Sequence, residues 1–156
     1  ELIEAEDDQG GKIISEIGYT IDNTSKTRAL FEINKGVGGD VKVDVNSKMT
    51  NEQRRVDFRN MIYIADGPSD VPAFSVVKGN GGATFAIYPK GNNKAFKQVE
   101  QLREDGRIDM FAEADYSDGT TASMWICNKI QEFAERIKKE EQAKRGNLSA
   151  IPHHLV

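Results

Sequence analysis

The sequence is poor in the residues that build disulfides, zinc sites and thiol chemistry. Its 156 residues include one cysteine, Cys127, and two histidines, the adjacent pair His153 and His154. One cysteine excludes an internal disulfide, and the chain has no Cys-His cluster with the spacing of zinc ligands. We expect Cys127 to be a buried helix residue and the two histidines to be exposed. A single cysteine is typical of a reducing compartment, so we expect a cytoplasmic protein.

The sequence also lacks a long apolar run, a visible signal peptide and an excess of positive charge. It has 21 Lys and Arg against 25 Asp and Glu, a net charge of -4. Nucleic acid and anionic membranes attract positively charged proteins, so this negative net charge gives no reason to expect either as a partner. The chain is long enough for one domain with a hydrophobic core. Because it begins with Glu1 rather than Met, we expect a fragment or a processed chain.

The stretch from Met61 to Val77 contains the pattern most indicative of a site. The apolar run Met61–Ala65 predicts a buried strand, and Asp66 follows it directly. Asp70 stands where a helix is expected to start, as an N-cap or first-turn residue, with Pro72 in the first turn. A strand, an acidic turn and a helix are typical of the carboxyl edge of a parallel sheet, where ligands bind. Two carboxylates four residues apart can face one hard cation such as magnesium, although either could instead serve only as a turn former or cap.

The rest of the chain alternates between predicted helices and strands. Helices are expected over residues 27–35, 94–103 and 121–143, and strands over residues 84–88, 108–112 and, as one or two short pieces, 12–19. Residues 1–8 should form a loop or a frayed helix end, and residues 46–60 a surface excursion with a helical turn from Asn51. Gly36 and Gly146 should end helices, which gives a domain over residues 1–146 and a tail over 147–156. The pattern indicates an α/β fold with a mainly parallel sheet.

Residues 63–74, Tyr-Ile-Ala-Asp-Gly-Pro-Ser-Asp-Val-Pro-Ala-Phe, resemble the fourth motif of the haloacid dehalogenase superfamily. In that family an apolar strand usually ends in Gly-Asp-Gly-x-x-Asp, and Ala65 stands here in place of the first Gly. Its members are mostly magnesium-dependent phosphatases on a Rossmann-like core. The resemblance implies that Asp66 is a direct magnesium ligand. It implies that Asp70 is either a second ligand or a residue that holds the first in place.

The family's third motif is a Lys at or near the start of the helix before that strand. Lys26, at the entrance of the expected helix 27–35, matches this placement best, and Lys35 at its end is the alternative. From the residues alone, Lys26 would be a solvated side chain, because a cation gains nothing from the dipole at a helix N-terminus. The pair Ala114-Asp115 is similar to a dipeptide that often follows the family's late strand. For Asp115 we expect a turn role.

The family's first motif, Asp-x-Asp-x-Thr/Val, and its second-motif Ser or Thr have no match in this chain. The resemblance therefore covers about residues 12–137 and only the carboxyl-terminal half of a family member. It implies part of a magnesium-dependent phosphomonoester phosphatase that acts on a small phosphorylated substrate. This chain would supply the metal-binding acids and the Lys but not the nucleophile, and so should be inactive alone. The alternative is a non-catalytic interaction or regulatory domain that keeps the same scaffold.

In this family the fourth-motif strand lies beside the first-motif strand. The resemblance therefore implies that the strand over residues 61–65 lacks a neighbour here. Natural proteins cover such an edge. We expect it to be covered by the missing amino-terminal half, by a second copy of the chain, or by the segment 12–19.

Overall fold

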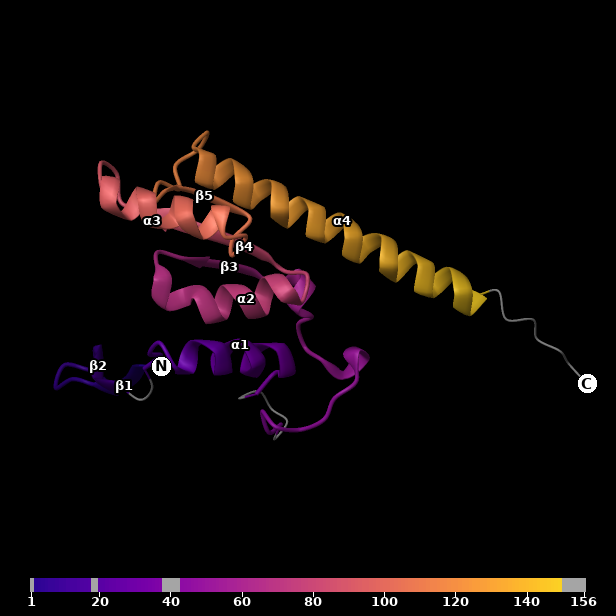
Figure 1. Cartoon of the computed structure of the whole chain (residues 1–156). Helices are drawn as coiled ribbons and strands as arrows, with labels where there is room; N and C mark the ends of the chain where they lie inside the picture. The colour runs from indigo at the N-terminus through magenta and orange to yellow at the C-terminus, as the bar shows by residue number, and fades with distance from the viewer. Residues whose placement is uncertain (1, 18–19, 38–42, 150–156) are drawn as a thin grey trace, which may run out of the picture. The chain divides into compact units, whose positions relative to one another are not determined.

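A computed structural model describes residues 2–17, 20–37 and 43–149 (Figure 1). The chain divides into two compact units, with Asp57 as the last residue of the first and Phe58 as the first residue of the second. The first unit holds a hairpin and one helix, and the second holds a parallel sheet with its helices.

The first unit opens with an antiparallel hairpin of β1 (Leu2–Glu6) and β2 (Lys12–Ile17). At its turn, Asp7 Oδ1 accepts hydrogen bonds from the N–H of Gln9 at 2.9 Å and of Gly11 at 2.7 Å. The turn at Gly10-Gly11 and a strand from Lys12 are thus confirmed. The loop or frayed helix expected over residues 1–8 is wrong, because this turn returns the chain and lets Leu2–Glu6 pair along β2. Gly18 and Tyr19 lie outside the described residues.

Helix α1 (Ser25–Lys35) confirms the helix expected here. Asp22 Oδ1 accepts from the backbone N–H of Thr24 and Ser25, at 2.9 and 2.7 Å, and satisfies donors at the helix start. Gly36 ends the helix in the left-handed conformation, at φ 77°, as predicted.

The excursion over residues 46–60 has the expected turn at Asn51, the 3-10 helix η1 (Asn51–Gln53). It is also tied to α1 within the first unit. The buried Asn34 donates from Nδ2 to the carbonyl of Val56 at 2.6 Å. Arg54 donates in turn to Asn34 Oδ1. This segment is therefore anchored and not a loose surface loop.

The second unit is a parallel sheet in the order β3-β4-β5, formed by β3 (Ile62–Ala65), β4 (Ala83–Tyr88) and β5 (Met110–Glu113). Helices follow each strand in turn: α2 (Val71–Gly79), α3 (Asn93–Glu104) and α4 (Thr121–Ser149). Two 3-10 turns, η2 (Phe58–Asn60) and η3 (Pro68–Asp70), flank β3. The predicted mixed α/β class with a parallel sheet is confirmed, with the antiparallel hairpin as an addition.

The two faces of this sheet carry separate cores. On one face, Phe74 of α2 and Val99 of α3 pack in one cluster with Ala86 of β4. On the other face, Phe85 of β4 stacks against Trp125 of α4, with ring centroids 4.9 Å apart. Helices therefore lie on both faces, which is the usual arrangement for a parallel sheet.

Helix α4 differs from its prediction in two respects. It continues through Gly146 to Ser149, so the predicted end at Gly146 is wrong; a helical Gly costs only about 1 kcal/mol relative to Ala and does not by itself stop a helix. Cys127 is exposed, contrary to expectation. It lies five positions after the buried Ala122, about 140° around the helix. His153 and His154 lie outside the described residues.

No helix in the described ranges combines the length and the hydropathy that a bilayer crossing requires. Strand β2 pairs with β1, and within the described residues β3 pairs with β4 alone. Of the three covers expected for the edge of β3, the segment over residues 12–17 pairs with β1 in a separate sheet and shows no pairing with β3. The hairpin turn gives those residues a nearer partner in β1.

Candidate functional site at the carboxyl end of β3

The acidic turn lies at the carboxyl end of β3, as the sequence predicts. Asp66 follows the strand directly and is exposed, whereas Asp70 ends η3 and is 2% exposed. The intervening Gly67 is extended and accepts the backbone hydrogen bond of Asp70 N–H at 3.1 Å, which closes the turn. Pro72 lies in the first turn of α2, where its missing N–H has no intrahelical partner to lose. Both predicted acids thus lie on one short turn at the end of β3.

The carboxylate of Asp70 does not act as a helix cap. Asp70 occupies the N-cap position of α2, but its side chain makes no capping hydrogen bond. Instead, Oδ1 accepts from the hydroxyl of Tyr63 at 2.7 Å, and Oδ2 accepts from Ser69 Oγ at 3.3 Å. A buried carboxylate costs several kcal/mol unless it is hydrogen-bonded, so the hydroxyl of Tyr63 is one of the groups that stabilise Asp70 in its buried position.

Tyr63 was not singled out by the sequence. It lies on β3 with its ring edge against Phe74, at 5.3 Å between centroids, and so reaches Asp70 from the α2 side of the sheet. Burial raises the pKa of Tyr63, and the hydrogen bond to Asp70 and the charge of Asp70 raise it further. Tyr63 therefore remains a neutral hydrogen-bond donor throughout the physiological range. The only sequence signal that could have placed Tyr63 beside Asp70 was the period-two alternation of side chains along β3, which decides the face of the sheet on which Tyr63 lies.

The donor chemistry of this turn fits a hard cation. Magnesium takes carboxylate oxygens, often from one or two acids, and keeps several waters. Asp66 offers an exposed carboxylate, and Asp70 lies four residues away with its oxygens held by hydroxyl donors. In the parts of the chain that the structure describes, no three His, Cys, Asp or Glu side chains gather as a metal site. A third carboxylate, His or Cys ligand would have to come from outside those parts.

The structure distinguishes between the two candidate lysines, Lys26 and Lys35. Lys35 Nζ donates to the carbonyl of Val45 and, at 2.6 Å, to the carbonyl of Ser47. Two of its three donors are thus used to hold the loop after α1, a structural role. Lys26 is the second residue of α1 and remains the better match to a phosphate-binding Lys. Lys26 belongs to the first unit and the acidic turn to the second.

A cavity of about 440 Å³ lies at the carboxyl ends of the other two strands. Tyr88 of β4, Glu113 of β5 and Thr120 before α4 contribute to its lining. Asp115, which also lines it, accepts from Ser117 N–H at 2.9 Å, and this bond lowers the pKa of Asp115. The turn role predicted for Asp115 is confirmed.

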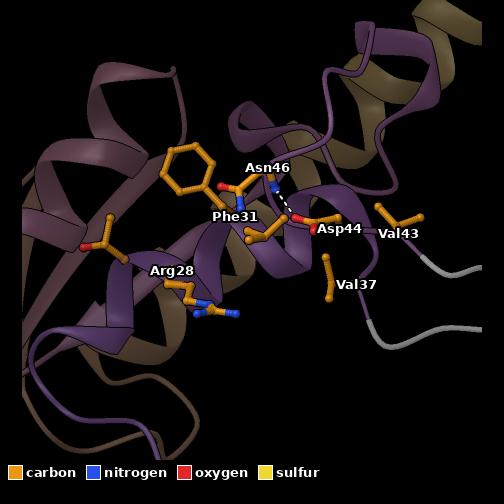
Figure 2. A pocket seen from close by; sticks show the side chains of 8 residues that line it. Arg28, Phe31, Val37, Val43, Asp44 and Asn46 are labelled. Atoms are coloured by element: carbon orange, nitrogen blue, oxygen red, sulfur yellow. Dashed lines mark hydrogen bonds between the residues drawn. The ribbon is translucent and has the colours of Figure 1, made fainter.

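The first unit has a cavity of about 570 Å³ that the sequence did not indicate (Figure 2). Its wall combines Arg28 and Phe31 of α1 with the loop residues Asp44 and Asn46. The backbone N–H of Asn46 donates to Asp44 Oδ1 at 2.7 Å, and Arg28 pairs with Glu32 at 2.8 Å. The first of these contacts lies within the loop and the second lies within α1.

A polar cluster around the buried Thr84, at the amino-terminal end of the sheet, was also missed. Asp109, just before β5, accepts from the N–H and the hydroxyl of Thr84, at 2.8 and 2.9 Å, and pairs with Lys78 at 3.0 Å. Burial acts to raise the pKa of Asp109, but the hydrogen bonds from Lys78 and Thr84 and the charge of Lys78 lower it overall. The cluster fastens the amino ends of β4 and β5 together and lies away from the acidic turn.

Comparison with known proteins finds a relative in Borreliella burgdorferi, an uncharacterized protein that is 39% identical over 122 residues. The match covers 76% of this chain, so it includes the segment from β3 through β5 with the acidic turn. The chain spans only 40% of the length of this curated relative. No family model and no solved structure matches the chain.

Proposed function

We propose that this chain is the carboxyl-terminal part of a magnesium-dependent phosphomonoester hydrolase of the haloacid dehalogenase type. The observation that carries the proposal is the turn after β3, where an exposed Asp66 and a buried, hydroxyl-bonded Asp70 stand at the carboxyl end of a parallel strand. Ligands of open α/β sheets bind at that edge. The likeness of residues 63–74 to the family's fourth motif gives the site its chemistry.

In this proposal each residue has one task. Asp66 and Asp70 would hold magnesium, which when bound neutralises charge on the phosphoryl oxygens. Tyr63 keeps the Asp70 carboxylate oriented through its 2.7 Å hydrogen bond. Lys26 would supply a positive charge to the phosphate. The Asp that attacks phosphorus and the residue that handles its proton would come from sequence outside these 156 residues.

The length of the relative agrees with a divided site. This chain spans 40% of that protein, so most of the longer polypeptide lies outside the shared part and has room for the first two motifs. The small phosphorylated substrate of the proposal would be selected mainly by that other part. The competing function is a non-catalytic interaction or regulatory domain. It is favoured by the absence of a recognisable nucleophile motif in the chain.

The test is hydrolysis of a generic phosphomonoester, p-nitrophenyl phosphate, with and without magnesium. It is run on the 156-residue chain and on the full-length Borreliella burgdorferi relative. We expect no turnover by the chain alone, and magnesium-dependent turnover by the relative that EDTA abolishes. Turnover by the chain alone that Asp66→Asn removes would mean that the chain contains a nucleophile after all. A relative inactive toward a broad panel of phosphomonoesters would favour the non-catalytic function.

A further inference from the structure

The cavity at the carboxyl ends of β4 and β5 is lined by residues of the second unit. Its volume of about 440 Å³ lies within the range of small-molecule sites. The lining runs from Tyr88 of β4 across the end of β5 to Thr121 and Ala122 at the start of α4. Asp66 and Asp70 do not line it. The cavity therefore uses neither of the proposed magnesium ligands.

Tyr88 and Glu113 stand side by side in this cavity. They are partners in the register of β4 and β5, and paired residues of neighbouring strands direct their side chains to the same face of the sheet. Burial raises the pKa of Tyr88, and the negative charge of Glu113 raises it further, so the two groups interact. The cavity thus presents an aromatic ring beside a carboxylate.

The ring of Tyr88 is held in place by two other aromatic rings. Phe96 of α3 meets it edge-on, with 5.4 Å between the centroids and 83° between the ring planes. Phe111 of β5, which also lines the cavity, has its centroid 6.3 Å from that of Tyr88 and 5.7 Å from that of Phe96. A ring that is already fixed loses little conformational freedom when a ligand packs on it.

The carboxylate of Glu113 is half-buried, and among the described residues none makes a hydrogen bond or an ion pair with it. Its polar neighbours in the lining are engaged. Thr120 Oγ1 donates to the carbonyls of Asp115 at 2.7 Å and Ser117 at 2.8 Å. Asp115 accepts from Ser117 N–H at 2.9 Å, and this bond and the charge of Lys90 lower the pKa of Asp115. No Lys, Arg or His is among the described residues that line the cavity, so Glu113 has no cation against it there.

We propose that this cavity binds a small organic ammonium ion, that is, a primary amine in its protonated form. The ammonium group would pair with the Glu113 carboxylate, and an ammonium also binds favourably over the face of an aromatic ring such as that of Tyr88. The alkyl part of the ligand would pack on the rings of Tyr88 and Phe111. An anion would be repelled by Glu113, and a neutral ligand would leave that carboxylate unpaired in a half-buried place. The inference uses no residue of the acidic turn and does not depend on the proposed function.

The test is a titration of the ¹⁵N-labelled 156-residue chain with n-butylammonium chloride, followed through the backbone amides by NMR. We expect saturable shifts at Glu113, Thr121 and Ala122, with a dissociation constant on the order of 1 mM for so small a ligand. The alcohol n-butanol has the same size without the charge and should bind at least about tenfold more weakly. Equal binding of the alcohol, or no shifts at the cavity with the ammonium ion, would overturn the proposal. Shifts centred on Asp66 and Gly67 would assign the cation to the acidic turn and would also overturn it.

Two variants test the role of the Glu113 charge in the same titration, at a salt concentration of about 0.15 M so that distant charges are screened. Glu113→Gln keeps the shape of the side chain and should weaken binding at least about tenfold. Glu104→Gln is the matched control, because Glu104 is the exposed last residue of α3 and does not line the cavity. It should change the dissociation constant less than about twofold.

Equal effects of the two variants would mean that only the net charge of the chain attracts the ligand, and they would overturn the proposal. The amide spectra of both variants report whether the fold is kept. If Glu113→Gln does not fold, the comparison of n-butylammonium with n-butanol in the unaltered chain decides the question.

Discussion

Tyr63→Phe is the substitution that tests how much the hydrogen bond from the Tyr63 hydroxyl to Asp70 stabilises the acidic turn. It removes one hydroxyl and leaves the ring free to keep its edge contact with Phe74, at 5.3 Å between centroids. What is lost is the 2.7 Å hydrogen bond to a carboxylate that is 2% exposed. A hydrogen bond to a charged group contributes about 1.5–3 kcal/mol. We therefore expect the free energy of unfolding of the second unit to fall by about that amount.

Trp125 makes this measurement specific to the second unit. It is the only tryptophan of the chain, and it stacks on Phe85 inside that unit. Guanidinium denaturation followed by its fluorescence therefore reports on the sheet that carries the turn. The matched control is Tyr116→Phe, because Tyr116 is 52% exposed. The control should change the free energy by no more than about 0.5 kcal/mol. If the two variants are equally stable, Tyr63 does not support Asp70.

The pH dependence of stability gives a second measure of how Tyr63 is held, through its burial first and its contact with Asp70 second. The pKa of Tyr63 is raised above its usual 10.0, so the folded protein keeps the proton that the unfolded chain loses. The contribution is complete below pH 10.0 and is lost as the pH rises above it. The unfolding free energy of the wild type should therefore decline above that pH more steeply than that of Tyr63→Phe. Parallel alkaline declines would contradict the assignment.

Two further predictions concern the packing and the electrostatics of the sheet. Gly82→Ala would place a Cβ in overlap with the carbonyl oxygen of Phe58. The substitution should therefore destabilise the second unit by about 1–3 kcal/mol in the same denaturation assay, and a neutral effect would refute the close approach. Asp109→Asn should be less stable than the wild type at neutral pH. Because Lys78 and Thr84 hold the pKa of Asp109 below 3.8, the difference should shrink as the pH falls below that value, and a constant difference from neutral to acid pH would refute the role of the charge.

The sequence predicted the elements whose apolar spacing is regular. The strand at Met61, the helix starting after Asp70 and the strand that ends at Tyr88 all follow from local pattern. The structure confirms these three elements, although β3 is half-buried rather than buried. The hairpin strand Leu2–Glu6 was missed because its residues alternate weakly and its conformation is fixed by pairing with β2. The extension of α4 past Gly146 was missed because a single Gly is a weak stop signal in a long helix.

At the candidate site, sequence spacing predicted which acids share the turn but not their environments. Asp66 and Asp70 have the same side chain, yet one is exposed and the other buried. The difference comes from η3, which turns Asp70 inward toward Tyr63, and no local pattern specifies a contact across seven residues. The role of Lys35 likewise depends on a loop ten and twelve residues away, whose carbonyls it binds.

The central claim, that the turn after β3 binds magnesium, is tested most directly by titrating the ¹⁵N-labelled chain with magnesium and following its backbone amides by NMR. We expect saturable shifts at Asp66, Gly67 and Asp70, weak in affinity because two carboxylates are the only acids of the turn. Asp66→Asn should abolish the shifts, whereas Asp118→Asn, at an exposed turn of the same unit, should keep them. Shifts at Asp70 that survive in Asp66→Asn, or no shifts in the wild type, would contradict the account.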